Sequence, residues 1–431
     1  MSKALIDLTA PTERALLVGA PLKRSSSRHQ TGEHLDELAR LTDTAGAAVV
    51  GTLTQLLDRP NPATYLGSGK IDELKTRIDD TDATLLIFDD ELSPSQGKNI
   101  EELTGKRVMD RAELILDIFA TRARSSEAKM QVELAQLEYL LPRLTRMWAH
   151  LEKFRGGIGV RGPGETQLET DRRLISHRIK VLRRRLEETS KSREVRRAGR
   201  ANEFRVSLVG YTNAGKSSVL RMLTNDQRVF VEDRLFATLD PLTRDVELDD
   251  GYRVLVTDTV GFVRKLPHQL VASFRATLEE VIEADLLLHV VDVSNPAWEE
   301  QRLVVLDVLA ELGVHDKPML HVFNKMDLLA PEQVVAVRDR LSNLVPGSVF
   351  VSAEDPDGLE PLRRELLRRQ KMVQRTIEVR LPISDGRTLA AIYRDGEVLA
   401  QRTEGSELVI SARLAADVAA RLAQQPAVTV S

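Results

Sequence analysis

The stretch GYTNAGKSS at residues 210–218 constrains the fold of this chain more than any other. It matches the pattern GxxxxGK(S/T), and it stands between an apolar run that predicts a strand and a segment from Val219 onward that predicts a helix. In this context the backbone N–H groups form a nest for a β-phosphate, and Lys216 neutralises the β- and γ-phosphate oxygens. The hydroxyl of Ser217 is placed to ligate Mg²⁺. The sequence therefore predicts a phosphate loop.

The surrounding segment, residues 203–371, predicts a doubly wound parallel α/β sheet. Apolar runs that suit buried strands alternate with helical stretches, which is the pattern of such sheets. The predicted strands are FRVSLVG, RVLVTD, DLLLHVVD, PMLHVFNK and SVFVSA. Ligands of these folds bind at the carboxyl ends of the strands, where the phosphate loop also begins.

The sequence DTVG at residues 258–261 ends the predicted strand RVLVTD. Asp258 therefore emerges at the same sheet edge as the phosphate loop, where its carboxylate can hold Mg²⁺ through water. The N–H of Gly261 can reach a γ-phosphate. A lone DxxG is a weak signal, but its spacing after the phosphate loop makes it specific.

The sequence NKMD at residues 324–327 predicts which base is bound. The carboxylate of Asp327 accepts hydrogen bonds from both N1–H and the exocyclic amine of guanine, and adenine offers no such pair of donors. Asn324 and the stem of Lys325 would pin and cover the ring. The SAE sequence at 352–354 would offer a backbone N–H to the guanine O6.

Another Gly-Lys pair lies in LGSGKI at residues 66–71. A phosphate loop ending there would need glycine at position 64 and Ser or Thr at position 71, where Thr64 and Ile71 stand. We interpret this stretch as a turn before a helix, with a second nucleotide site as the alternative.

Between these regions, leucine-rich heptads predict two long helices. Met130, Leu134, Leu137, Leu141, Leu144, Trp148 and Leu151 repeat at spacings of 4 and 3, and Leu168, Ile175, Ile179, Leu182 and Leu186 continue the pattern. An antiparallel hairpin is the simplest arrangement, with a kink expected at Pro142. The alternative is a coiled coil that dimerises the chain. The glycine-rich stretch RGGIGVRGPGETQLETDRR, residues 155–173, would occupy the tip of the hairpin.

The second of these helices is strongly basic. The segment from Arg172 to Arg200 contains twelve Lys or Arg residues and three Glu residues, so its charge is +9, whereas the net charge of the whole chain is −4. This asymmetry indicates a surface for an anionic partner, with a solvated helix face as the alternative.

The chain contains no cysteine, which excludes disulfides and thiolate sites and fits a reducing compartment. Its apolar runs are far shorter than a bilayer span, and the N-terminus does not suit a secretory signal. We expect a cytosolic protein without a membrane anchor. The predicted domains are an α/β domain at 12–125, the hairpin at 126–200, the nucleotide-binding domain at 203–371 and a small α+β domain at 376–431.

In this order the motifs resemble the translation-factor-like P-loop GTPases, and the HflX family of ribosome-associated GTPases in particular. The resemblance covers nearly the whole chain, and the glycine-rich stretch upstream of the GTPase motifs narrows it to this family. The segment LFATLDPLTR is part of the match, and by that resemblance Thr238 meets Mg²⁺ and the γ-phosphate. SAE in place of the usual SAK, and DPLTR in place of DPTTR, are the departures.

The resemblance assigns catalysis to Lys216, Thr238 and Gly261, with Mg²⁺ on Ser217, Thr238 and, through water, Asp258. The predicted GTP contacts are Gly210, Tyr211, Thr212, Asn213, Ala214, Gly215, Lys216, Ser217, Phe236, Ala237, Thr238, Leu239, Asp240, Asp258, Thr259, Val260, Gly261, Asn324, Lys325, Met326, Asp327, Ser352, Ala353 and Glu354.

Phe262 stands where Ras-like proteins keep the glutamine that orients the attacking water. Phenylalanine cannot hydrogen-bond water, so we expect slow intrinsic hydrolysis that awaits a partner, unless Phe262 simply packs. Asn213 matches the asparagine that some related GTPases use to hold K⁺, although Asn also suits tight turns. Residues 234–244 and 261–267 are predicted to respond to the nucleotide state.

The resemblance also implies the partner. A monomer would bind the large ribosomal subunit and its rRNA, with the tip residues Arg155, Gly156, Gly157 and Arg161 as candidate RNA contacts, and with GTP it would split stalled or idle ribosomes. Two alternatives remain: an RNA-remodelling protein with a nucleotide site in its first domain, and a GTPase switch for a protein or membrane target.

Overall fold

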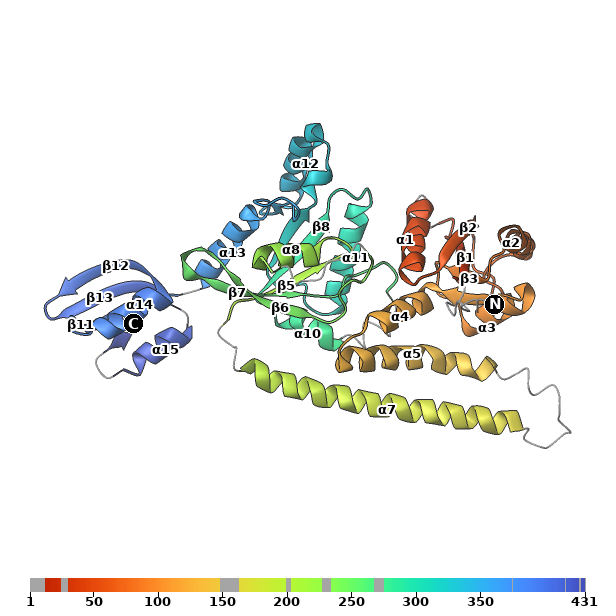
Figure 1. The fold of residues 1–431 in the computed structure, drawn as a ribbon, viewed down its shortest axis with the longest axis horizontal. Coiled ribbons are helices and arrows are strands. Elements are labelled where there is room, and N and C mark those ends of the chain that lie inside the picture. Colours follow the sequence, from red (N-terminus) through yellow and green to blue (C-terminus); the bar gives the residue numbers. More distant parts are fainter. Residues whose placement is uncertain are drawn as a thin grey trace, which may run out of the picture. The chain divides into compact units, whose positions relative to one another are not determined.

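The computed structural model describes residues 12–24, 30–147, 163–198, 203–226, 234–266, 275–373, 375–414, 416–425 and 428–430 (Figure 1). The chain divides into two compact units. The first contains residues 1–190 together with 233–240 and 263–276, and the second contains 191–232, 241–262 and 277–431. The predicted RNA contacts Arg155, Gly156, Gly157 and Arg161 lie outside the described residues.

The N-terminal α/β domain is confirmed. Its sheet is parallel, with the order β2-β1-β3-β4. The strands are β1 (Arg14–Gly19), β2 (Ala48–Thr54), β3 (Leu85–Phe88) and β4 (Arg107–Asp110), and the helices are α1 (Thr31–Thr44), α2 (Ser68–Thr81), α3 (Pro94–Thr104) and α4 (Arg111–Arg122). Strand β1 is flanked by β2 on one side and β3 on the other, so the direction of winding reverses between β1 and β3. That position is where open α/β sheets form a crevice at the strand ends.

The predicted helical hairpin is also confirmed. Helix α5 (Ser126–Met147) and helix α7 (Pro163–Ala198) lie side by side, and the chain returns along α7 (Figure 1). Their apolar stripes meet in one cluster: Leu134, Ile179 and Leu182, flanked by Met130, Leu137, Leu141, Ile175 and Leu186. Arg178 holds Glu133 through two bonds of 2.6 and 2.8 Å, and Arg183 holds Glu138 at 2.7 Å. The stripe of α5 is therefore covered from within the same chain.

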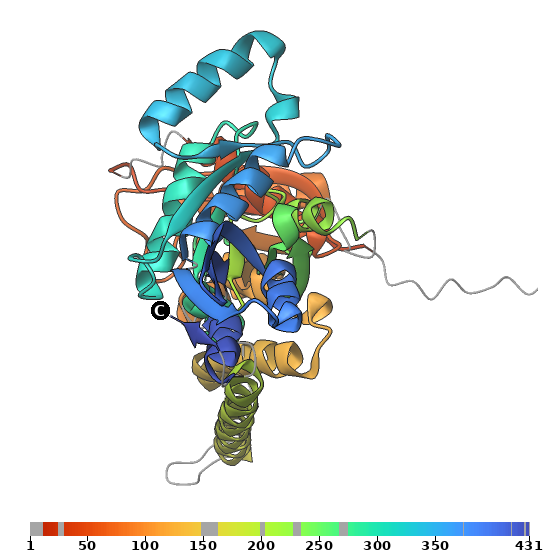
Figure 2. The ribbon, with the colours of Figure 1, turned by 90° about the vertical axis from the view of Figure 1, so that its left-hand side faces the viewer.

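Helix α5 continues through Pro142 to its end. Figure 2 looks nearly along the axis of α7, which runs as one unbroken helix over its described length. Among the residues that the structure describes, no helix is long and apolar enough to cross a membrane.

The nucleotide-binding domain has a sheet of order β10-β9-β8-β5-β7-β6. Its elements are β5 (Arg205–Gly210), α8 (Lys216–Thr224), β6 (Leu242–Glu247), β7 (Arg253–Asp258), α10 (Arg275–Glu283), β8 (Leu286–Asp292), α11 (Trp298–Glu311), β9 (Met319–Asn324), α12 (Pro331–Leu344), β10 (Val349–Phe350) and α13 (Glu360–Val373). The five predicted strands are parallel neighbours.

The sheet departs from the predicted parallel arrangement at one edge. Strand β6 was not predicted, and it pairs with β7 in the antiparallel direction. Only a 3₁₀ turn (Asp249–Gly251) and its flanking residues join β6 to β7, and so short a connection can join only antiparallel neighbours. The charged, half-exposed sequence LTRDVE hid this edge strand from a search for apolar runs.

The C-terminal domain is the predicted small α+β domain. Its antiparallel sheet has the order β12-β13-β11-β14. The elements are β11 (Arg375–Pro382), α14 (Gly386–Asp395), β12 (Gly396–Glu404), β13 (Glu407–Leu414), α15 (Ala416–Ala423) and β14 (Thr429–Val430). Ile392, Val379, Ile410 and Ala412 form the centre of its core.

Candidate nucleotide site

The phosphate loop has the conformation that its sequence predicts. It leaves the central strand β5 at Gly210 and enters α8 at Lys216. Gly215 precedes the helix with a φ of +91°, a left-handed conformation that suits glycine, and a Cβ there would clash with the side-chain amide of Asn324. The first turn of α8 therefore opens toward the loop, with the positive end of the helix dipole where a phosphate would bind.

The side chain of Lys216 folds back over this loop. Its Nζ donates to the carbonyls of Tyr211 at 2.9 Å and Gly210 at 3.3 Å, and the residue is only 6% exposed. Burial lowers the pKa of Lys216 to about 8, while the carboxylate of Asp258 acts in the opposite direction. Two of the three ammonium donors are thus fixed by the backbone, which orients the charge before any ligand binds.

Ser217 and Asp258 come together beside this lysine. The Ser217 hydroxyl donates to the Asp258 carboxylate at 2.6 Å, and Asp258 is fully buried at the end of β7. A hydroxyl and a carboxylate are the oxygen ligands that Mg²⁺ prefers, so this donor pair fits the predicted ion.

The DTVG segment lies directly against the phosphate loop. Phe262 donates its N–H to the Gly210 carbonyl at 3.1 Å and accepts the N–H of Thr212 at 2.7 Å. A Cβ on Gly261 would lie 2.6 Å from the Cα of Thr212, so only glycine allows this approach. The side chain of Phe262 is buried. We call this backbone pairing the closed arrangement.

Asn324 joins the guanine-reading motif to the phosphate loop. It is buried at the end of β9, donates to the Ala214 carbonyl at 3.0 Å and accepts the N–H of Ala353 at 3.3 Å. One amide thus holds together the phosphate loop, NKMD and SAE, three segments that are far apart in the sequence.

The neighbouring residues leave Asp327 accessible. Lys325 adopts a φ of +63° and its ammonium pairs with Asp292 at 2.8 Å, while Asp327 is exposed in a 3₁₀ turn (Met326–Leu328). Asp292, the partner of Lys325, was not among the predicted site residues. Its position at the end of the predicted strand DLLLHVVD, the neighbour of β5 at the same sheet edge, was the available signal.

Some residues that were predicted to contact GTP have side chains that are buried or hydrogen-bonded within the protein. Thr259 is buried and its hydroxyl donates to the Leu208 carbonyl at 2.6 Å, and Val260 is also buried. Asn213 has a φ of +61°, which asparagine tolerates in tight turns. The K⁺ ligand at Asn213 stays a prediction.

The predicted contacts from Phe236 to Asp240 belong to the first unit. The Phe236 ring is buried and packs edge to face on Phe119 at a centroid distance of 4.6 Å. The Asp240 carboxylate accepts the backbone N–H of Ser125 at 3.1 Å and of Arg124 at 3.3 Å, and also the Ser125 hydroxyl. This segment is therefore attached to α4 and to the start of α5.

The arrangement in the second unit places the chain among the P-loop GTPases, since the NKMD motif, which predicts guanine selectivity, is anchored directly on the phosphate loop. Residues 32–120 match the family model described as "GTP-binding GTPase N-terminal", residues 122–200 match "GTP-binding GTPase Middle Region" and residues 205–325 match "50S ribosome-binding GTPase".

The chain is 46% identical to the protein named GTPase HflX of Magnetococcus marinus, over 95% of this chain and 94% of that protein. It is 45% identical to the GTPase HflX of Escherichia coli, over 84% of this chain and 85% of that protein. A crystal structure of a GTP-binding protein from Sulfolobus solfataricus in complex with GDP is 26% identical, with a TM-score of 0.43, over 83% of this chain and 98% of that one. The chain belongs to the HflX family of GTPases, and it hydrolyses GTP.

Proposed function

We propose that this GTPase binds the large ribosomal subunit and, with GTP bound, dissociates stalled or idle ribosomes, and that the ribosome stimulates hydrolysis. The observation that carries the proposal is the arm formed by α5 and α7. The two helices are held along their length by an apolar stripe and by the Arg178 and Arg183 ion pairs. Such an arm suits reaching into a folded RNA.

The charge of the arm supports an RNA partner. Helix α7 carries a series of exposed basic side chains: Arg172, Arg173, Lys180, Arg184 and Arg185. Lys and Arg contacts to phosphates dominate the affinity of proteins for RNA, and they make binding weaken as salt rises. The description of the family model that matches residues 205–325 names the same partner, the 50S ribosome.

In this function Lys216 orients and neutralises the phosphates, and the N–H of Gly261 meets the γ-phosphate. Ser217 and Asp258, the latter through water, would hold Mg²⁺ with Thr238, and the ion would neutralise charge that develops on the phosphates. Asp327 would select guanine, with a backbone N–H of the SAE segment at 352–354 donated to its O6. Phe262 offers no group to orient water, so the intrinsic rate should be slow and partner-dependent. Equal rates in K⁺ and Na⁺ buffers would remove the K⁺ role of Asn213.

Sedimentation of ribosomes with the protein tests the proposal. Ribosomes are layered on a gradient after incubation with protein and GDP, GTP or a non-hydrolysable GTP analogue. We expect the protein to travel with the large subunit, and the fraction of free subunits to rise with the triphosphate forms. Subunits that neither bind nor separate preferentially with the triphosphate would refute it.

The tip of the arm can be tested separately. Replacing Gly156, Gly157 and Gly159 with alanine should leave the intrinsic GTPase rate unchanged but weaken stimulation by ribosomes, because these residues are proposed to contact RNA and not nucleotide. The intrinsic rate and the GTP affinity of the same variant serve as the internal control. A fall in GTP affinity would instead mean that the glycines bind the nucleotide.

A further inference from the structure

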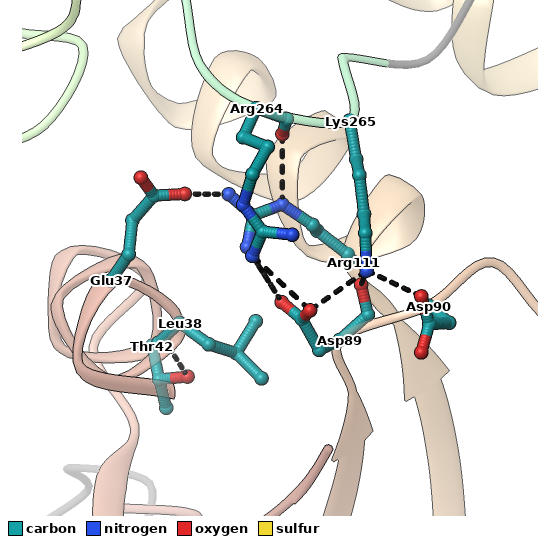
Figure 3. Close-up of polar contacts among 8 residues, drawn as sticks. All are labelled: Glu37, Leu38, Thr42, Asp89, Asp90, Arg111, Arg264 and Lys265. Carbon is teal, nitrogen blue, oxygen red and sulfur yellow. Dashed lines mark hydrogen bonds and ion pairs between the residues drawn. The ribbon is translucent and has the colours of Figure 1, made fainter. Parts of the chain in front are cut away.

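A cluster of six charged residues in the first unit holds the segment that follows the DTVG motif. The members of this Asp89 cluster are Glu37, Asp89, Asp90, Arg111, Arg264 and Lys265 (Figure 3). Arg264 and Lys265 come just after Phe262 in the chain. The four other residues belong to the N-terminal domain, far away in the sequence.

Asp89 is the centre of the cluster. It follows β3 at the carboxyl end of the strand, beside the point between β1 and β3 where the winding of the sheet reverses. Its carboxylate accepts Arg111 at 2.8 Å, Arg264 at 3.2 Å and Lys265 at 2.8 Å. Three cations therefore converge on one carboxylate.

Arg111 binds both the carboxylates of the cluster and the backbone of the held segment. This arginine is 1% exposed at the start of α4, and its guanidinium also pairs with Glu37 on α1. Its Nε donates to the carbonyl oxygen of Arg264 at 3.0 Å. A buried, fixed arginine thus holds the main chain of the segment and not only its side chains.

The charges in the cluster balance only while the segment is docked. Glu37, Asp89 and Asp90 carry three negative charges, and Arg111, Arg264 and Lys265 carry three positive ones. Withdrawal of Arg264 and Lys265 leaves three carboxylates with one arginine, a net charge of −2. Because unpaired charges are costly to keep near the protein interior, undocking is opposed.

The held segment is joined to the closed arrangement by a very short piece of chain. One residue, Val263, separates Phe262, whose backbone pairs with Gly210 and Thr212, from Arg264, whose carbonyl is held by Arg111. A γ-phosphate that takes the N–H of Gly261 would pull on the next residue, Phe262, whose two backbone bonds hold it to the phosphate loop. Because only Val263 separates Phe262 from Arg264, a fixed residue 264 limits how far Phe262 can move.

We propose that Asp89 and Arg111 are positioning residues of the GTPase reaction. By holding Arg264 and Lys265 they favour the closed arrangement of Gly261 and Phe262, and so they lower the affinity for GTP relative to GDP. Undocking of the segment then accompanies binding of the triphosphate. This inference concerns the hydrolase itself and does not depend on the ribosomal partner.

The test measures the affinities of the full chain for GDP and for a non-hydrolysable GTP analogue by calorimetry. Lys265→Glu places a carboxylate against Asp89 and Asp90 at a residue whose side chain is 37% exposed, so the fold should tolerate it. We expect the affinity for the analogue to rise by about fivefold, the lower end of typical coupling between sites, with that for GDP unchanged.

A variant in which the charges of residues 90 and 265 are exchanged distinguishes an effect of docking from a general structural defect. Asp90→Lys combined with Lys265→Glu restores one ion pair, so the affinity for the analogue should return part of the way. Lys23→Glu breaks an exposed pair with Asp58, 2.8 Å in the native chain, and should change neither affinity. An unchanged ratio of the two affinities in Lys265→Glu, an equal shift of both, or a double variant that behaves like the single one would each overturn the proposal.

Discussion

Two of the Gly-Lys pairs in this chain lie where a helix begins, and their structures differ. At Gly215 and Lys216 the chain turns through a left-handed residue and the lysine folds back onto the carbonyls of its own loop. At Gly69 and Lys70 both residues already lie in the first turn of α2, and the ammonium pairs with Glu73 at 2.9 Å. The predicted helix is present, but residues 68–71 already belong to it, and the turn lies before them at residues 61–65.

The difference comes from what precedes each glycine. Strand β5 runs directly into its loop, so the loop amides gather at the carboxyl end of the sheet. Strand β2 ends at Thr54, and a turn at 61–65 separates it from α2. A lysine next to a helix start is therefore not sufficient for a phosphate site. The loop that wraps the phosphate must connect strand and helix without interruption.

The largest expected difference between the two regions is in GTP turnover after Lys216 or Lys70 is replaced. Lys216→Ala should lower kcat/KM for GTP by about 10²- to 10³-fold, as loss of one preorganised charge-stabilising group does in other enzymes. Lys70→Ala should change it less than about twofold, because it removes only an ion pair with an exposed glutamate. Steady-state release of phosphate with GTP and with ATP measures both. Loss of GTP turnover in Lys70→Ala, or ATP turnover that survives Lys216→Ala, would place a working nucleotide site in the first domain.

Changing the base-reading carboxylate should produce the next largest effect. Asp327→Asn replaces an acceptor-only group with an amide, which cannot accept both guanine donors. Loss of a hydrogen bond to a charged group costs about 1.5–3 kcal/mol, so the affinity for GTP should fall by about 10- to 100-fold. Xanthosine triphosphate, with a carbonyl in place of the exocyclic amine, should gain affinity. Asp316→Asn, at an exposed site away from the motif, is the control. Retained guanine preference in Asp327→Asn would contradict the assignment.

The buried ammonium of Lys216 predicts a pH dependence. Its pKa is lowered to about 8, so the free protein loses this charge as the pH rises past that value. Phosphate binds the charged form, so the affinity for GTP should fall by about fivefold between pH 8 and pH 9, and by about tenfold for each further pH unit, where the lysine is mostly neutral. Lys216→Gln should show a flat profile over the same range. A wild-type profile that is equally flat would mean that the lysine stays charged.

The same pKa fixes the sign of a stability change. A pKa that is lower in the folded protein than in the unfolded chain means that the unfolded chain binds more protons between pH 8 and about 10.4. The contribution of Lys216 to the free energy of unfolding therefore increases across that window, relative to Lys216→Gln. Denaturant unfolding of the two proteins at pH 7.5 and pH 9.5 measures it.

The smallest contrast is between the two glycines. Gly215→Ala forces a left-handed alanine, which costs about 1–2 kcal/mol, and its Cβ would also meet Asn324. Gly69→Ala lies in a helix with open space at the new methyl group and should stabilise the protein by about 0.4–1 kcal/mol. Denaturant unfolding compares the two variants. A destabilising Gly69→Ala would indicate that residues 66–71 need a special backbone after all.

Sequence patterns were sufficient for the elements whose signals are local. The strand-loop-helix context of 210–218, the carboxyl-edge position of Asp258 and the heptads of α5 and α7 follow from chain periodicity alone, and each lies as predicted in the fold. Strand β6 was missed because an edge strand needs only one buried face, and only Leu242 and Val246 of its six residues are apolar.

Side-chain contacts between distant segments could not be predicted. Asn324 was assigned to the base, yet its amide also holds the Ala214 carbonyl, 110 residues earlier. Arg111 and Arg264 are separated by 153 residues, and no sequence pattern distinguishes either of them from a surface arginine. Only the fold brings Arg264 to the carboxyl end of β3, where Asp89 and Arg111 meet it.

We propose that the phosphate loop at residues 210–217 carries out a GTP hydrolysis that the ribosome stimulates. The rate of GTP hydrolysis with and without purified large ribosomal subunits, for the native chain and for Lys216→Ala, tests this proposal. We expect a slow rate without subunits and a rate up to about five powers of ten higher with them, as in partner-activated GTPases, and Lys216→Ala should abolish the increase. A native rate that large subunits leave unchanged would contradict it.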